Sequence, residues 1–385
     1  MLLIDRPASA ERSSRWSIGQ DKEEAMTFRY IGSKARVTDT IRSVVAENLV
    51  RGSRFVDGFA GTGAVAASVA DLGVPLIVND TMHAAITMAL ARLVSVDEAR
   101  FHNLGGYAAA IDHLNQLASI EGYMHRAYSP ASKRHAPVER RYFTEHNAGR
   151  IDAMRRQIAQ WAATGVTSQT EDILLLGDLI GAVNRAANIA GTYGCFLSNW
   201  QNSALDPVVI RGRDLLDRTV EVAGVVGDVH DLEIRPDDVV YYDPPYTKRQ
   251  YASYYHILET LVVNDEPVVE GVSGLRPWRN KASVFCYKRK ALSALVELIT
   301  GTRAGTVLLS YSCEGHVDLE ELDDLLKVSG NVSVMPIDRI GRYRPNVTAS
   351  GNGDAVTEYL VRYEKKSSPA RVGDEVGKQP QKEMA

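Results

Sequence analysis

The segment Tyr242–Tyr246, with the sequence YDPPY, carries the residues best suited to chemistry, and it follows a hydrophobic run that predicts a strand. An amino nitrogen attached to an aromatic ring is a poor nucleophile, because its lone pair is delocalised. The Asp243 carboxylate and the Pro244 carbonyl could each accept a hydrogen bond from such a nitrogen, and two prolines, Pro244 and Pro245, would fix both acceptors. Tyr246 offers a flat aromatic face. An isolated DPP is more often a rigid turn with a capping aspartate, so this chemistry needs a second motif.

The second motif is Phe55–Gly63, with the sequence FVDGFAGTG, where a predicted strand ends in a glycine-rich turn. Glycines let the backbone turn sharply and approach a ligand closely. Asp57, just before the glycines, could face the ammonium group of a methionine-type cofactor. Read literally, Gly61-x-Gly63-x-x-Ala66 also matches the dinucleotide fingerprint, which is a weak signal alone.

Two further positions favour a cofactor site. Asp80 ends the next predicted strand, where a carboxylate can accept hydrogen bonds from both ribose hydroxyls, although a helix N-cap is the commoner role for such an aspartate. Lys34 ends the segment RYIGSK at an expected helix start, where the helix dipole disfavours a cation. A ligand would explain that lysine, and a plain loop is the alternative.

Taken together, RYIGSK, FVDGFAGTG, the strand ending in Asp80 and YYDPPY resemble the Dam-like class of adenine-specific DNA methyltransferases, including its restriction–modification members. The resemblance spans about residues 28–363 and keeps that class's motif order. It implies direct in-line transfer of a methyl group from S-adenosyl-L-methionine to the 6-amino group of a flipped-out adenine in double-stranded DNA. It also implies catalytic roles for Asp243, Pro244, Pro245 and Tyr246, and cofactor contacts by Tyr30, Lys34, Asp57, Phe59, Gly61, Gly63, Asp80, Asp228, Val229 and Asp243.

Other functions remain open at this point. A nicotinamide-dependent oxidoreductase would explain the glycines and Asp80 but gives DPPY no purpose. RNA or protein methylation more often goes with Asn in place of Asp243, and methylation of cytosine's amino group with Ser. A non-catalytic DNA-binding module would not need Asp243 and Tyr246.

Short β-rich runs alternate with helical stretches, which predicts an α/β fold with a mostly parallel, Rossmann-like methyltransferase sheet and a late edge hairpin. The expected strands are 53–57, 75–80, 222–229, 239–243, 306–311, 332–337 and 356–363, and the expected helices include 64–72, 254–262 and 319–327.

The domain prediction divides the chain at changes in this rhythm. Residues 26–95 and 221–363 form the catalytic domain, and 96–220 form an inserted, largely helical target-recognition region. Residues 1–25 are an expected flexible extension, with Met26 a candidate native start, and 364–385 an expected disordered tail.

The formal net charge is −4, but residues 100–160 hold nine basic and five acidic side chains. A local basic face suits an enzyme that grips phosphates on one side, and a solvated helical surface explains the charge equally well. The candidate DNA contacts are Arg140, Arg141 and Arg155 in the insert, with Arg276 and Arg279 beyond it.

The three cysteines are far apart and show no metal-ligand spacing, so we expect no metal and a reducing cytoplasm, in a bacterium or phage-infected host. The first twenty residues lack a signal-peptide core, and no apolar run approaches the ~20 residues of a membrane span. We expect a monomer that acts on double-stranded DNA, with a restriction endonuclease of the same site as a candidate partner.

Overall fold

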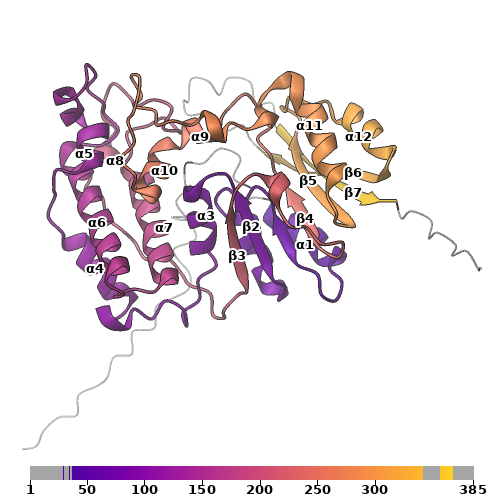
Figure 1. The fold of residues 1–385 in the computed structure, drawn as a ribbon, viewed down its shortest axis with the longest axis horizontal. Helices are drawn as coiled ribbons and strands as arrows, with labels where there is room; N and C mark the ends of the chain where they lie inside the picture. Colours follow the sequence, from indigo (N-terminus) through magenta and orange to yellow (C-terminus); the bar gives the residue numbers. More distant parts are fainter. Residues whose placement is uncertain (1–28, 30–33, 35–36, 341–355, 367–385) are drawn as a thin grey trace, which may run out of the picture.

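The computed structural model describes residues 29, 34, 37–340 and 356–366. A seven-stranded sheet with the order β3-β2-β1-β4-β5-β7-β6 forms the right-hand part of Figure 1. Its strands are β1 (Phe55–Asp57), β2 (Leu76–Asp80), β3 (Val222–Val226), β4 (Val239–Tyr242), β5 (Thr306–Ser312), β6 (Gly330–Ile340) and β7 (Val356–Lys365).

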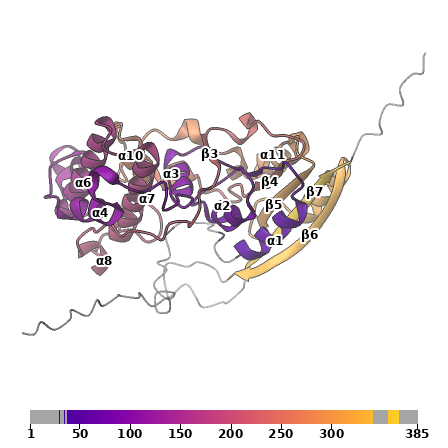
Figure 2. The ribbon, with the colours of Figure 1, turned by 90° about the horizontal axis from the view of Figure 1, so that it is seen from below.

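The strands β3, β2, β1, β4 and β5 pair in parallel, and β7 lies antiparallel between β5 and β6. This confirms the expected mostly parallel sheet with a late hairpin, which curves along one edge in Figure 2. Parallel strands present their carboxyl ends at one edge of the sheet, where ligands bind in such folds. The ends of β1, β2 and β4 therefore meet at one place.

Both faces of the sheet are covered by helices. The helices α1 (Thr38–Asn48) and α2 (Ala64–Val69) pack on one face, and α11 (Lys288–Gly301) and α12 (Leu319–Lys327) on the other. Successive residues of β1 belong to the two separate cores, since Phe55 is buried on the first face and Val56 on the second. A strand buried on both sides reads as a continuous apolar run rather than an alternating one.

A helical lobe forms the left-hand part of Figure 1. It comprises α4 (Tyr107–Gln116), α5 (Tyr123–Tyr128), α6 (Glu145–Ala163), α7 (Gln169–Ala186) and α8 (Asn202–Leu205), packed against α3 (His83–Ala91), α9 (Tyr251–Tyr254) and α10 (His256–Val263). Its core joins Ile158 of α6 and Leu179 of α7 to Met88 of α3 and Leu258 of α10. The predicted insert is thus helical, but its core also draws in helices from the sequence on either side. None of the described helices is long and apolar enough to cross a membrane.

Several predicted boundaries shift. The strand expected over 222–229 ends at Val226, which leaves Asp228 and Val229 in a loop. The single helix expected over 254–262 is two helices, broken at Tyr255. The last strand continues to Lys365, into the predicted tail, because it pairs with a neighbour on each side that far. The extension 1–25 and the tail beyond residue 366 lie outside the described residues.

Candidate active site

A cavity of about 210 Å³ opens at the carboxyl ends of β1, β2 and β4. Its walls come from the glycine-rich loop after β1, the loop after β4 and the segment before α11. Nine of the residues predicted to act in the site line it: Lys34, Asp57, Phe59, Gly61, Asp80, Asp228, Val229, Asp243 and Pro245. Residues of the glycine-rich motif and of the DPPY motif therefore line one cavity, because β1 and β4 are neighbours in the sheet.

The glycine-rich loop folds tightly over the strand ends. The Gly58 amide donates to the Tyr241 carbonyl at 2.9 Å, and the Ala60 amide donates to the Asn79 carbonyl at 2.8 Å. Gly63 has φ +74°, and a Cβ there would lie 2.4 Å from the Ala89 Cα. This glycine lets α2 begin against α3. It does not line the cavity, and its predicted cofactor contact stays a prediction.

Two carboxylates face the cavity, the buried Asp57 and the half-buried Asp80. Asp57 accepts one hydrogen bond, from the Phe59 amide at 3.3 Å, and burial together with Asp243 raises its pKa to about 8. Asp80 accepts from the Gly61 amide at 3.2 Å and the Met82 amide at 3.0 Å, while burial raises its pKa to about 6. Asp80 therefore binds backbone at the start of α3, in the manner of a cap, while still lining the cavity.

The Asp243 carboxylate forms a buried cluster with two partners. The Lys34 ammonium lies 3.0 Å from Asp243 Oδ1 and 3.2 Å from Glu358 Oε2. Burial raises the pKa of Asp243 to about 6, against the opposing effect of Lys34. Burial alone would lower the pKa of Lys34, but the carboxylate of Asp243, the Tyr246 hydroxyl and the carboxylate of Glu358 raise it above its usual value. The cluster thus holds a lysine cation beside an ionised Asp243 at neutral pH.

The rest of the DPPY motif lies around this cluster. The ring of Tyr246 has the Lys34 ammonium 5.4 Å from its centroid, packs edge-on against Tyr311, and has its hydroxyl 3.5 Å from Glu358 Oε1. Pro244 is buried, and neither it nor Tyr246 lines the cavity, whereas Pro245 does. Tyr30 lies outside the described residues.

Aromatic rings close one end of the cavity. Phe59 makes edge contacts with Tyr242 at 5.9 Å and with Phe285 at 5.6 Å between ring centroids. Asp228 accepts a hydrogen bond from the His230 amide at 3.0 Å, which holds the loop after β3 in place. The cavity therefore combines an apolar, aromatic end with a carboxylate-rich end.

Sequence reasoning missed a second ion cluster at the rim. The buried Glu259 of α10 accepts hydrogen bonds from the His83 amide at 3.2 Å, the Ala84 amide at 2.9 Å and the Lys281 ammonium at 2.7 Å. Burial would raise the pKa of Glu259, but Lys281, the Ala84 amide and the His83 side chain hold it below its usual value. Glu259 joins α10, α3 and the cavity wall, where Lys281 lies.

Three of the five arginines proposed for DNA are committed to protein groups instead. Arg140 is buried and donates to the carbonyls of Ala127, Gly271 and Val272 at 3.0–3.2 Å. Arg155 donates to the carbonyls of Leu261 and Val262 at the end of α10, and Arg276 pairs with Asp265 at 2.7 Å. Arg140 and Arg155 thus supply donors to backbone carbonyls inside the protein, and Arg276 is held by a carboxylate. The structure thus argues against phosphate contacts by these three arginines.

The remaining two arginines are accessible. Arg141 is 38% exposed, pairs with Glu139 at 2.8 Å and donates to the Ser198 carbonyl. Arg279 is exposed and forms no ion pair with the described residues. Among the residues that the structure describes, no cluster of His, Cys, Asp and Glu could hold a metal ion.

Comparison with known proteins gives a consistent result. The profile of the D12 class N6 adenine-specific DNA methyltransferases matches residues 30–311. The Type II methyltransferase M.FokI of Planomicrobium okeanokoites is 33% identical over 79% of this chain and 47% of its own length. The modification methylase StsI of Streptococcus sanguinis is 32% identical over 80% of this chain and 48% of its own. The Type II methyltransferase M.NlaIII of Neisseria lactamica is 27% identical over 88% of this chain and 99% of its own. The chain thus spans about half the length of the first two relatives.

Proposed function

Because the chain belongs to the D12 class N6 adenine-specific DNA methyltransferase family, we propose that it transfers a methyl group from S-adenosyl-L-methionine to the 6-amino group of adenine in double-stranded DNA. One observation carries the proposal. The partly buried Asp243 carboxylate lies beside the buried Lys34 cation, on the wall of a cavity that Asp57 and Asp80 also line.

The cavity's chemistry fits the proposed cofactor. S-adenosyl-L-methionine would supply an electrophilic methyl group on a sulfonium centre. Asp57 and Asp80 offer carboxylates to ammonium and hydroxyl donors, and the Asn79 Oδ1 is buried and accepts no hydrogen bond from the described residues. The rings of Phe59 and Phe285 supply an apolar end for a planar base.

Asp243 and Pro244 would act on the target amino group. An ionised carboxylate and a carbonyl can accept hydrogen bonds from both N–H groups and so draw the nitrogen toward tetrahedral geometry. The ion pair with Lys34 keeps the carboxylate charged and in a fixed position, so that little reorganisation is needed in the transition state. Tyr246 is the candidate stacking partner for a base turned out of the duplex.

Direct transfer, without a covalent enzyme–base intermediate, is the proposed route. None of the three cysteines lines the cavity. Cys286 is next to the lining residue Phe285, but burial raises the pKa of its thiol to about 11. A thiol that holds its proton is a poor nucleophile.

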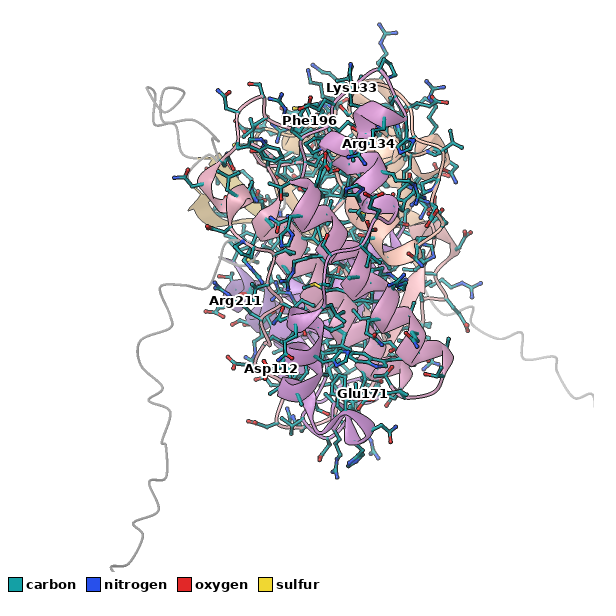
Figure 3. The ribbon with its side chains drawn as sticks, turned by 90° about the vertical axis from the view of Figure 1, so that its left-hand side faces the viewer. Asp112, Lys133, Arg134, Glu171, Phe196 and Arg211 are labelled. Carbon is teal, nitrogen blue, oxygen red and sulfur yellow. The ribbon has the colours of Figure 1, made fainter. Side chains whose placement is uncertain are left out.

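The helical lobe is the proposed source of target recognition. Figure 3 shows Lys133, Arg134 and Phe196 at its upper end, the same end of the molecule at which α9 follows the DPPY loop in Figure 1. Arg141 and Arg279 remain candidates for phosphate contacts. The relatives' names suggest a restriction–modification or phage–host modification setting, in which a restriction endonuclease would act on the same site.

The decisive experiment is expression in a methylation-free host, followed by long-read mapping of modified bases. We expect N6-methyladenine within one recurring sequence. Asp243→Ala should lower the transfer rate at least 100-fold, the typical cost of losing one preorganised group, and should leave the melting temperature close to that of the parent chain. Methylated cytosine, methylated RNA alone, or near-normal activity of Asp243→Ala would refute the proposal.

A further inference from the structure

A concentration of positive charge borders the cavity. The segments 247–252 and 279–293 contain seven lysines and arginines and no acidic residue: Lys248, Arg249, Arg279, Lys281, Lys288, Arg289 and Lys290. Of these, Lys281 pairs with Glu259, and the other six are exposed and form no ion pair with the described residues.

Hydrogen bonds bring the two segments together. The Cys286 thiol donates to the Arg249 carbonyl at 3.3 Å. The Gln250 side chain donates to the Ser283 carbonyl at 3.1 Å and accepts from the Ser283 amide at 2.8 Å. The loop that follows DPPY therefore lies against the residues that lead into α11. Gln250 and Ser283 also line the cavity, so the charges stand beside its mouth.

The start of α11 is electrostatically unfavourable as it stands. Lys288, Arg289 and Lys290 occupy its first three positions, no acid lies in its first turn, and no side chain caps it. The amino end of a helix dipole is positive, so three cations there repel it and one another. Lys290 lies over the Tyr287 ring at 5.9 Å, which offsets little of this cost at an exposed site. A bound anion would relieve the repulsion.

We propose that six unpaired cations, here called the rim cations, bind phosphates of the DNA strand that carries the target adenine. The rim cations are Lys248 and Arg249 in the loop after DPPY, Arg279, and Lys288, Arg289 and Lys290 at the start of α11. This proposal deepens and rests on the proposed function. The rim cations would hold the backbone beside the cavity while the helical lobe reads bases. Contacts of this kind position the DNA and carry no sequence information.

The test compares two rim variants with a control whose charge change equals that of the larger rim variant. Lys288→Gln, Arg289→Gln and Lys290→Gln are combined in a rim variant, and Lys248→Gln with Arg249→Gln forms a second one. The control combines Arg51→Gln, Arg235→Gln and Arg303→Gln, which are exposed, without ion pairs among the described residues, and located before β1, β4 and β5 at the opposite edge of the sheet. Dissociation constants for duplex DNA are measured from 50 to 200 mM salt.

The triple rim variant should flatten the plot of log Kd against log salt by up to about 2.7 units of slope, at about 0.9 per phosphate contact. The double rim variant should flatten it by up to about 1.8 units, and the control should not change it. The set of methylated sites should stay the same. The melting temperature of the triple rim variant should be equal or higher, because a helix start loses its repelling charges.

Equal slopes in the rim variants and the control, with intact methylation by the parent chain, would overturn this inference and leave the proposed function standing. A parent chain that neither methylates DNA nor binds it in a salt-dependent way would overturn both.

Discussion

Replacing Lys34 by methionine should move the pH dependence of methyl transfer. The substitution removes the ammonium 3.0 Å from Asp243 while keeping a side chain of similar length. Two opposite charges at that distance interact by about 5 kcal/mol at an effective dielectric constant of 20. This energy corresponds to a shift of about 4 units in the pKa of Asp243. We expect an observed rise of at least about 2 units, because water or a shifted side chain will replace the ammonium in part.

The pKa of Asp243, about 6 in the parent chain, should therefore rise to about 8 or more in Lys34→Met. Because its pKa is raised, the carboxylate of Asp243 takes up a proton at a higher pH as the pH falls, and the active, ionised form is lost there. At pH 7 the ionised fraction should fall from about nine-tenths to about one-tenth, so the rate should drop about tenfold and return near pH 9.

The assay is single-turnover methyl transfer from pH 5 to 10 at saturating cofactor, since the resemblance also gives Lys34 a cofactor contact. Lys34→Arg keeps the charge, so the rate should still fall to half its maximum near pH 6 on the acidic side of the profile. In Glu358→Gln this midpoint should lie at a lower pH, because the charge of Glu358 raises the pKa of Asp243. An unchanged midpoint in Lys34→Met, or a rate that stays low at pH 9, would refute the electrostatic role of the ion pair.

Three further outcomes are expected. Tyr246→Phe should retain activity, since only a 3.5 Å contact to Glu358 is lost, whereas Tyr246→Ala should weaken binding of DNA with an extruded adenine by about 1–3 kcal/mol in a fluorescent base-analogue assay. The cofactor's affinity by calorimetry should rise with pH up to about 8, where Asp57 becomes ionised in the free protein, and Asp57→Asn should flatten that dependence. Arg140→Met leaves the buried Ala127 carbonyl and the partly buried Gly271 and Val272 carbonyls without their donor, so urea unfolding should show a loss of about 1–3 kcal/mol while the salt dependence of DNA binding stays unchanged.

The motif residues at the carboxyl ends of strands could be predicted because each is placed by the strand that directly precedes it in the sequence. Asp57, Asp80 and Asp243 each end a hydrophobic strand or follow it directly, and parallel pairing then brings them together. Strand pairing needs only the apolar pattern and the turns, both of which the sequence displays.

Partners set by tertiary packing could not be predicted. Glu358 is 324 residues from Lys34, and only the placement of β7 beside β5 brings it to Asp243. An acid near the start of the strand expected over 356–363 was the available signal for it. The arginines failed for a related reason: a count of positive charge does not distinguish a side chain in solvent from Arg140, whose acceptors lie in a turn over 130 residues away.

The shared core of the lobe has a consequence for how such an enzyme can acquire a new recognition sequence. Met88 of α3 and Leu258 of α10 are part of that core, and α3 starts shortly after Asp80 at the end of β2, while α10 follows the DPPY loop and α9. The Glu259 side chain of α10 accepts a hydrogen bond from the Ala84 amide of α3, which connects the two helices. A foreign lobe joined at residues 96 and 220 would therefore meet a mismatched surface on two catalytic helices. Exchange of the whole lobe for one with a different specificity should therefore need compensating substitutions in α3 and α10. Single substitutions within the existing lobe are the easier evolutionary route to a new recognition sequence.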